Sequence, residues 1–397
     1  MSRLFIDIGS SSLFKSGQKI GGDVFLLSRN PDKSQIVCTL SDGLGSGVKA
    51  NVLASLTARM AHKLSFSPMH LVNSATIIMN TLPVCKERKI SYSTFTIADI
   101  RLQEEQGVVL NLVEYDNPRA LVFVQGQSKQ WEPQTKNLHR QGAFKEEVIL
   151  HSTLTMEQGD RLILFSDGVS QAGLGTQKNL GWRRAGVESF VQQKIRRNPD
   201  IGSKALAEAI TAKALELDIY TAKDDITTAV VFVRSPRRTL IVTGPPFSPS
   251  DDEQLVQKVV AFEGKKIISG GTTAHIVSRL TNKPLKMDMK SWSKDIPPCS
   301  KMEGVDLVTE GMLTLCKVAK ALENKQSADQ FPDDAVRRFL HILEISDHVH
   351  FIVGTKINEA HQDPKIPVEI GIRRTLISRI CRALEELYLK ETTIEYI

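Results

Sequence analysis

Cysteine is scarce in this sequence, and its thiols are spread along the whole chain. The five cysteines are Cys38, Cys85, Cys299, Cys316 and Cys381. Because no two of them form a Cys-x-x-Cys pair, neither a zinc site nor a dithiol redox motif is indicated. Isolated thiols are typical of a protein that stays in a reducing compartment, so we expect free, buried cysteines.

Long apolar runs are missing as well. No stretch approaches the roughly 20 apolar residues that a membrane-spanning helix requires. The first residues, MSRLFIDIGSSSLFK, contain an aspartate and no apolar core of signal-peptide length. We therefore expect a cytoplasmic protein with no membrane partner.

Charge of one sign is not concentrated either. The chain has 51 Lys and Arg against 45 Asp and Glu, a net charge of +6, and its basic residues are scattered. Without a recognition motif, this balance predicts no nucleic-acid partner. With 41% hydrophobic and 24% charged residues the composition is that of a globular protein, and 397 residues suffice for two or three domains.

The first part of the chain combines strand-like and helical patterns. Short β-branched and aromatic runs between turn residues predict strands, and longer stretches of helical periodicity predict helices. The expected strands are 5–9, 23–29, 35–42, 92–102, 107–115, 120–126, 160–169 and 224–234, and the expected helices are 48–64, 68–82, 182–196 and 203–217. Strands that follow strands, with helices gathered in a few places, indicate an α+β fold with a largely antiparallel sheet sandwich.

The pattern changes near residue 236. From there strand-like and helical segments alternate, beginning with TLIVTG and DDEQLVQKVVAFEG and ending with the long helical segment IRRTLISRICRALEELYL. Such alternation predicts an α/β domain with a mostly parallel sheet. We therefore expect two domains, 1–235 and 236–397.

Aspartates stand at the ends of several apolar strands in the first domain. Two copies of Ser-Asp-Gly follow the apolar runs IVCTL and RLILF, and further aspartates occur in GGDVF and KDDITT. These residues are Asp23, Asp42, Asp167, Asp224 and Asp225. A single Asp-Gly is usually a turn, but clustered carboxylates repel one another unless a cation lies between them. Since Mg²⁺ and Mn²⁺ prefer oxygen ligands, the cluster predicts a metal centre.

The order and flanking residues of these motifs resemble the PPM-type, metal-dependent Ser/Thr protein phosphatases, and specifically their SpoIIE-type branch. The matching stretches are IGGDVF, LSDGLGSGVKA, YDNPRAL, QGDRLILFSDGV and DDITTAVVF, all within about residues 1–235. The resemblance implies an α-β-β-α sandwich with two divalent ions, Mn²⁺ or Mg²⁺, at one end of the two sheets. It also implies hydrolysis of phosphoserine or phosphothreonine by a metal-bridging water.

The resemblance gives each aspartate a role. Asp42 would bridge both metals, and the Gly43 carbonyl would complete one of the two sites. Asp23 would support the first metal directly or through water, whereas Asp167 and Asp224 would bind the other metal.

The neighbouring positions add one supporting residue and two departures. Asp225 would stand beside the last ligand without binding a metal itself. Many relatives carry a histidine two residues after the bridging aspartate, but this chain has Leu44, so water would protonate the leaving oxygen. No arginine matches the phosphate-holding position; Lys15 and Lys19 are candidates by position only, and solvated lysines are the alternative.

The branch typically acts on small phosphorylated regulatory proteins such as anti-sigma-factor antagonists, so the resemblance implies a partner of that kind. An alternative is a catalytically silent phosphatase fold that works as a binding or sensor module, against which the presence of all four metal-type aspartates argues. A third interpretation takes DGLGSG as the ATP lid of a GHKL-type kinase; it is disfavoured because strand-like runs, not a helix, precede Asp42.

The second domain offers one candidate site. The residues Gly270, Gly271, Thr272 and Thr273 end a strand and open a helix, and exposed N–H groups at a helix N-terminus favour anions. A small anionic ligand is therefore expected there, with a tight turn between strand and helix as the alternative. No family is indicated for this half, and a regulatory role rests on the domain pairing alone.

Overall fold

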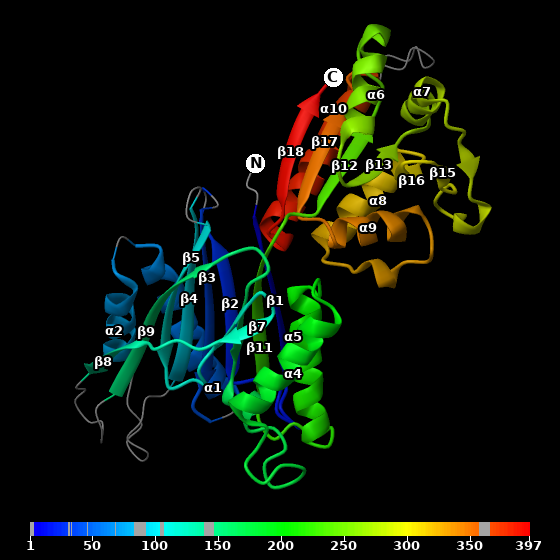
Figure 1. Cartoon of the computed structure of the whole chain (residues 1–397). Helices are drawn as coiled ribbons and strands as arrows, with labels where there is room; N and C mark the ends of the chain where they lie inside the picture. The colour runs from blue at the N-terminus through cyan, green and yellow to red at the C-terminus, as the bar shows by residue number, and fades with distance from the viewer. Residues whose placement is uncertain are drawn as a thin grey trace. The chain divides into compact units, whose positions relative to one another are not determined.

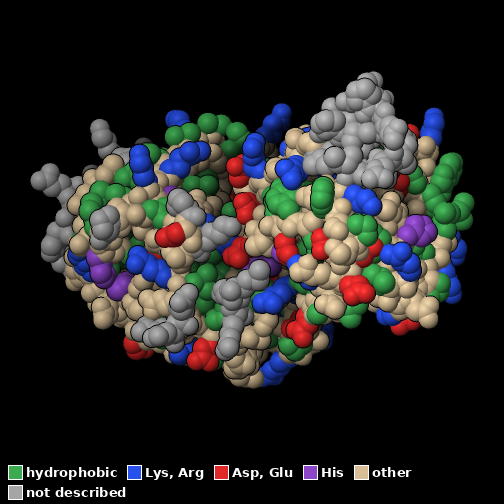
Figure 2. Space-filling view, turned by 90° about the horizontal axis from the view of Figure 1, so that it is seen from above, with side chains coloured by type: hydrophobic (Ala, Val, Ile, Leu, Met, Phe, Trp, Pro, Cys, Tyr) green, Lys and Arg blue, Asp and Glu red, His purple; other side chains and the backbone are tan. Residues whose placement is uncertain are grey.

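The computed structural model describes residues 4–30, 32, 34–45, 47–67, 69–82, 93–103, 107–138, 147–356 and 366–397. The chain divides into two compact units (Figure 1): unit 1 is Met1–Ser235 and unit 2 is Pro236–Ile397. Within the described segments, no helix has both the length and the apolar character needed to cross a membrane. On the face drawn in Figure 2, Lys and Arg side chains lie among Asp and Glu side chains.

Unit 1 contains two sheets in which every strand pair is antiparallel. Their strand orders are β1-β11-β10-β6-β7 and β2-β3-β4-β5-β9-β8. The first sheet consists of β1 (Phe5–Leu13), β6 (Leu121–Val124), β7 (Gln127–Lys129), β10 (Arg161–Phe165) and β11 (Ile226–Arg234). The second consists of β2 (Asp23–Arg29), β3 (Gln35–Gly43), β4 (Ser93–Gln103), β5 (Gly107–Tyr115), β8 (Gln134–Leu138) and β9 (Glu147–Met156).

Three buried apolar layers hold unit 1 together. The helices are α1 (Val48–Ser65), α2 (Leu71–Thr81), α3 (Asp167–Ser170), α4 (Arg183–Arg197) and α5 (Ser203–Leu217). The middle layer joins the two sheets and includes Leu40 of β3 and Leu164 of β10. One outer layer packs α1 and α2 on the second sheet, and the other packs α4 and α5 on the first (Figure 1). The expected α+β fold, an α-β-β-α sandwich, is confirmed.

One strand predicted in unit 1 was expected to extend too far toward the C-terminus. Residues 160–169 were expected to be a single strand, but β10 ends at Phe165 and α3 begins at Asp167. The apolar run RLILF is buried throughout, and the chain leaves the sheet at Ser166, where its backbone N–H bonds the Thr227 carbonyl. The turn places Asp167 on the first residue of a short helix instead of within a strand.

Unit 2 contains one mixed sheet, mostly parallel as expected. Its order is β14-β15-β16-β13-β12-β17-β18. The strands are β12 (Arg238–Thr243), β13 (Lys265–Ser269), β14 (Lys286–Met287), β15 (Ser300–Met302), β16 (Val305–Thr309), β17 (His348–Val353) and β18 (Glu391–Tyr396). The helices are α6 (Asp252–Ala261), α7 (Gly271–Thr281), α8 (Met312–Glu323), α9 (Ala335–Glu344) and α10 (Ile366–Tyr388), and three short 3-10 turns are η1 (Pro249–Asp251), η2 (Met289–Ser291) and η3 (Ala328–Gln330).

Alternating strand residues of unit 2 face two different cores, because successive side chains of a strand point to opposite faces. Ile241 of β12 packs with α8, α9 and α10 on one face of the sheet. Its neighbours Leu240 and Val242 pack with α6 and α7 on the other face. Both faces are therefore covered by helices, the usual arrangement around parallel strands.

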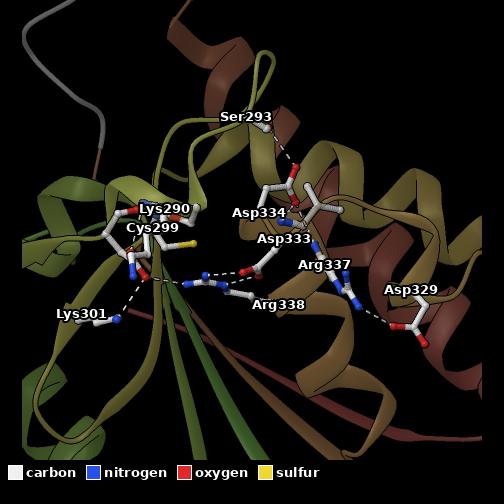
Figure 3. Close-up of polar contacts among 12 residues, drawn as sticks. Lys290, Ser293, Cys299, Lys301, Asp329, Asp333, Asp334, Arg337 and Arg338 are labelled. Atoms are coloured by element: carbon white, nitrogen blue, oxygen red, sulfur yellow. Dashed lines mark hydrogen bonds and ion pairs between the residues drawn. The ribbon is translucent and has the colours of Figure 1, made fainter.

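A polar network fastens α9 to the antiparallel edge of this sheet (Figure 3). The Arg338 guanidinium donates to both oxygens of Asp333, at 2.8 and 2.9 Å, and to Asp288 at 2.9 Å. Lys301 of β15 pairs with Asp288 at 3.3 Å. Asp334 accepts the Val336 N–H at 2.9 Å and so caps α9. These carboxylates are thus engaged in holding the fold.

Candidate active site

The aspartates of β2 and β3 face each other. The antiparallel pairing of these strands places Asp23 directly opposite Asp42. Thr94 of β4 lies opposite Asp42 on its other side. Directly opposed residues on an antiparallel pair have their Cβ atoms about 4.5–5.5 Å apart. Two carboxylates predicted from separate motifs are therefore neighbours at one end of the second sheet.

The first sheet supplies the other aspartates. Phe165 of β10 pairs with Thr228 of β11, so Asp167 and Asp224 lie just beyond adjacent strand ends. The two ends are in close contact at Gly168, where an added Cβ would lie only 2.1 Å from the Asp225 carbonyl oxygen. A glycine at this position lets the Asp167 turn rest against the start of β11.

Gly43 is required by the close packing of α1. A Cβ at this position would lie 2.1 Å from the Ala50 carbonyl oxygen. The Gly43 N–H donates to the Gly22 carbonyl oxygen at 3.2 Å, which ties the end of β3 to the residue before Asp23. The glycine of this SDG motif therefore lets the first turn of α1 pack against the end of β3, next to Asp42.

Asp225 shapes the loop that leads into Asp23. Its carboxylate accepts the Lys15 N–H at 2.9 Å and the Gly22 N–H at 2.6 Å. The residue itself is buried. Both carboxylate oxygens are occupied by backbone donors, which agrees with a supporting role beside the last ligand.

The aspartates strongly affect one another's protonation. Burial, together with the charges of the four other aspartates, raises the pKa of Asp42 to about 9. Burial raises the pKa of Asp23 to about 7, although the Ser166 and Thr227 side chains oppose this shift by hydrogen bonding. The pKa of Asp167 is also raised, first by burial and then by the charge of Asp224, while a hydrogen bond with Asp42 opposes the rise.

The donor chemistry suits divalent cations, but the side chains do not form a finished site. Asp23 Oδ2 is buried and has no hydrogen-bond partner among the described residues. Such an oxygen is costly to leave unpaired, and a cation would satisfy it. Nevertheless, no group of three or more His, Cys, Asp or Glu side chains within the described segments is arranged to hold a metal ion. Cation binding would therefore require the carboxylates to turn toward a common centre.

Two residues near the centre were missed by the sequence interpretation. The side chains of Ser166 and Thr227 lower the pKa of Asp23 against the effect of burial, so both lie near its carboxylate. Their signal is present, since each stands next to or two residues after a motif aspartate, in FSDG and DDIT. Of the lysine candidates, Lys15 uses its backbone N–H to bind Asp225, and Lys19 is exposed.

The glycines and threonines singled out in the second domain lie elsewhere, in unit 2. Gly270 follows β13 and caps α7, whose first residues are Gly271, Thr272 and Thr273. The structure therefore places all four at one strand-to-helix junction, as their sequence order predicts.

A comparison with known families decides the relationship of unit 1. The model of the family described as Stage II sporulation protein E (SpoIIE) matches residues 32–234, more than half of the chain. The chain belongs to the SpoIIE family. This confirms the resemblance to SpoIIE-type PPM phosphatases, and the match includes Asp42, Asp167 and Asp224.

Solved structures give weaker similarities to this SpoIIE family member. The phosphatase domain of SpoIIE from Bacillus subtilis, in a crystal form without domain swapping, is 14% identical, with a TM-score of 0.43 over 59% of this chain and 94% of that one. The PP2C phosphatase domain of the same protein with a fragment of its regulatory domain is 19% identical, with a TM-score of 0.47 over 58% and 64%. RsbX in complex with magnesium is 18% identical, with a TM-score of 0.39 over 57% and 95%. No curated protein matches the chain.

Proposed function

We propose that this SpoIIE family member is a metal-dependent protein serine/threonine phosphatase, with unit 1 as its phosphatase domain. One observation carries the proposal: Asp42 lies directly opposite Asp23, and Asp167 and Asp224 lie just beyond the paired ends of β10 and β11. Burial, and after it the charges of these aspartates, raises the Asp42 pKa. A fold that collects mutually repelling carboxylates gains stability when cations bind between them.

Each aspartate of this centre would have its own role as a metal ligand. Asp42 would bridge two cations, Mn²⁺ or Mg²⁺, with the Gly43 carbonyl and Asp23 on one side and Asp167 and Asp224 on the other. When bound, the cations would supply an acidic water that attacks phosphorus and would neutralise the phosphoryl oxygens. The buried, unpaired Asp23 Oδ2 is the structural support for a ligand role at that residue.

No side chain is assigned as the acid for the leaving group. Leu44, two residues after Asp42, carries no proton to donate. The leaving seryl or threonyl oxygen would therefore take its proton from water. Turnover should then show no requirement for a protonated histidine.

The proposed substrate is a phosphorylated regulatory protein, of the anti-sigma-factor antagonist type. Membership of the SpoIIE branch supports this choice. Unit 2 is the proposed regulatory or ligand-binding domain, supported by its being a separate compact unit of the same chain.

A catalytically silent binding module is the second candidate. It is favoured by one observation, that the described side chains form no ready-made metal site. The two candidates differ in turnover and not in fold, so they are separated by an activity measurement with controlled metal content.

The test is hydrolysis of a phosphoserine peptide by the full-length chain in EDTA, Mg²⁺ or Mn²⁺. We expect activity with metal only, and its loss in Asp42→Ala. Asp329→Asn is the matched control, because Asp329 is a highly exposed aspartate of unit 2 that pairs with Arg337. Metal binding by calorimetry without hydrolysis of any phosphopeptide would favour the binding module, and hydrolysis that survives in EDTA would refute the metal mechanism.

A further inference from the structure

Unit 2 has a topological switch in its parallel sheet. The chain runs from β12 outward to β13 and β16, and then returns to add β17 and β18 on the other side of β12. All of these pairings are parallel, so the strands' carboxyl ends lie at one edge. Ligands of open α/β sheets bind outside such an edge, near the switch point.

Backbone contacts close one half of this edge. Gly354, just after β17, lies so close to the loop after β12 that an added Cβ would be 2.1 Å from the Pro245 carbonyl oxygen and 2.3 Å from that of Gly244. The β12–β17 side is therefore filled by main chain. The space for a ligand is on the other side, beyond β12, β13 and β16.

Three glycines meet on that open side. A Cβ on Gly311 would lie 3.3 Å from the Gly270 Cα. A Cβ on Gly270 would lie 4.0 Å from the Gly244 nitrogen and 3.7 Å from the Thr273 Oγ1, with no closer neighbour. The volume next to Gly270 is thus bordered, at ordinary contact distances, by a hydroxyl group and a backbone nitrogen.

Helix α7 presents uncapped donors to this volume. Its N-cap, Gly270, has a φ of 135° and no side chain that could accept from the first turn. The first intrahelical bond is made by the Ala274 N–H to the Gly270 carbonyl, so the N–H groups of 271–273 have no acceptor within the helix. A negatively charged group would satisfy these donors and interact favourably with the helix dipole.

A buried hydroxyl gives the independent evidence for a ligand. Thr273 is fully buried, and its Oγ1 has no hydrogen-bond partner among the described residues. A buried hydroxyl without a partner is destabilising, because the hydrogen bonds it made to water are not replaced. The Oγ1 lies toward Gly270, the N-cap residue of α7, because it is 3.7 Å from where a Gly270 Cβ would stand.

Helix α8 shares part of this arrangement, since its N-cap is Gly311 and the buried Thr314 Oγ1 has no hydrogen-bond partner among the described residues. The two neighbouring helices differ from α7 in the acidic groups at their first turns. At α8 the Glu310 carboxylate already accepts the Leu313 N–H at 3.3 Å. Helix α6 opens with its own acidic residues, Asp252 and Glu253. Arg373 adds positive charge at the edge, because its Nη1 lies 2.6 Å from where a Gly244 Cβ would stand.

We propose that unit 2 binds the phosphate group of a small molecule at the N-terminus of α7, held by the N–H groups of 271–273 and the Thr273 hydroxyl. The site is independent of the aspartate centre in unit 1. It makes unit 2 a receptor for a phosphorylated metabolite or nucleotide.

The experiment is calorimetric titration of the full-length chain with inorganic phosphate and with pyrophosphate, in EDTA so that the aspartate centre holds no metal. We expect saturable binding that persists in Asp42→Ala. Gly271→Asp should abolish it, because the new carboxylate would occupy the anion position. Nothing lies within 4 Å of a Cβ at Gly271, and an acidic residue in the first turn favours the helix, so this variant should fold. Gly271→Ala is its uncharged control and should bind normally.

Thr273→Val supplies a second test, in which phosphate affinity should fall although the stability of the ligand-free protein does not. It should weaken phosphate binding at least about tenfold, which is about 1.4 kcal/mol, and leave the ligand-free melting temperature equal to or above that of the wild type. Thr281→Val is the matched control: its hydroxyl donates to the Val277 carbonyl at 2.7 Å, so it should lower the melting temperature and leave binding unchanged. The proposal is overturned if neither anion binds saturably, if binding survives Gly271→Asp, or if Thr273→Val destabilises the ligand-free chain.

Discussion

Asp23 and Asp42 stand directly opposite each other across the antiparallel pair of β2 and β3. Burial and neighbouring charge raise both pKa values, to about 7 and about 9, so the metal-free protein holds protons where ordinary aspartates, with a value of 3.8, are ionised. The predictions below follow from this opposition and from the groups that surround it.

The stability of the metal-free protein should fall as the pH rises. A raised carboxyl pKa means that the folded chain binds the proton more tightly than the unfolded chain. Stability is therefore fully present below about pH 4 and is lost as the pH passes about 7 for Asp23 and about 9 for Asp42. The slope is at most about 1.4 kcal/mol per pH unit for each group.

Thermal unfolding in EDTA between pH 5 and 9, with and without Mn²⁺, measures this effect. Added metal should restore the melting temperature most at high pH, where the carboxylates are ionised. A melting temperature that rises from pH 5 to pH 9 in EDTA would contradict the prediction.

Asp42→Asn should stabilise the metal-free protein at pH 8 while removing metal binding. At pH 8 the folded wild type must keep the Asp42 carboxyl protonated, because its pKa is about 9, whereas the unfolded chain has lost this proton. The amide keeps the shape of the side chain and is neutral in both states, so this cost disappears. We expect a gain of about 1 kcal/mol or more in the free energy of unfolding in EDTA. Chemical denaturation with and without Mn²⁺ measures both effects; a variant that Mn²⁺ stabilises as strongly as the wild type would show that Asp42 is not a ligand.

Gly43→Ala should displace α1 from the site. The added methyl group would lie 2.1 Å from the Ala50 carbonyl oxygen, a backbone atom that cannot yield by rotating a side chain. We expect a loss of about 1–3 kcal/mol in stability and a loss of metal-dependent activity. Gly202→Ala is the control: its Cβ would find only Asp7 Oδ2, at 3.7 Å, so both properties should be nearly unchanged.

Asp225→Asn should impair the site without removing a ligand. One carboxylate oxygen becomes an NH₂ group, which would face a backbone N–H of either Lys15 or Gly22 in place of accepting from it. The loop before Asp23 should loosen, with a cost of about 1–3 kcal/mol. Metal affinity, measured by calorimetry, should fall about 10–100-fold; full loss of binding would instead make Asp225 a direct ligand.

The sequence reveals the metal-type aspartates because each ends or begins an apolar strand, and that local signal survives in the fold. It does not reveal what Asp225 contacts, since Lys15 and Gly22 are 210 and 203 residues away along the chain. Position next to a motif residue suggests a supporting role, but only the pairing of distant loops shows which donors it binds.

Secondary structure was predictable where the periodicity is strong. Helix α5 has the expected bounds, Ser203–Leu217, because its small and apolar residues recur on one face. Strands β8 and β9 were not expected: QTKNL is almost wholly polar, and EVILHSTLTM mixes histidine, serine and threonine into an apolar run. Their strand character comes from pairing with each other and with β5, which is tertiary information.

For the anion site proposed in unit 2, likewise, the sequence shows one part of the evidence and only the fold shows the other. Gly270 and Thr273 are visible in the sequence as a strand-to-helix junction. That the Thr273 hydroxyl is buried without a partner depends on how α7 packs, which no local pattern encodes.

The pairing of β1 with β11 has a consequence for biosynthesis. The first strand of unit 1 pairs with its last, and β11 is an interior strand of its sheet, between β1 and β10. A chain still growing from the ribosome cannot complete this sheet until residues 226–234 have emerged. Asp224 and Asp225 arrive at that same late moment, so no partly synthesised chain can assemble the aspartate centre. Any phosphatase activity would therefore begin only with a fully synthesised unit 1.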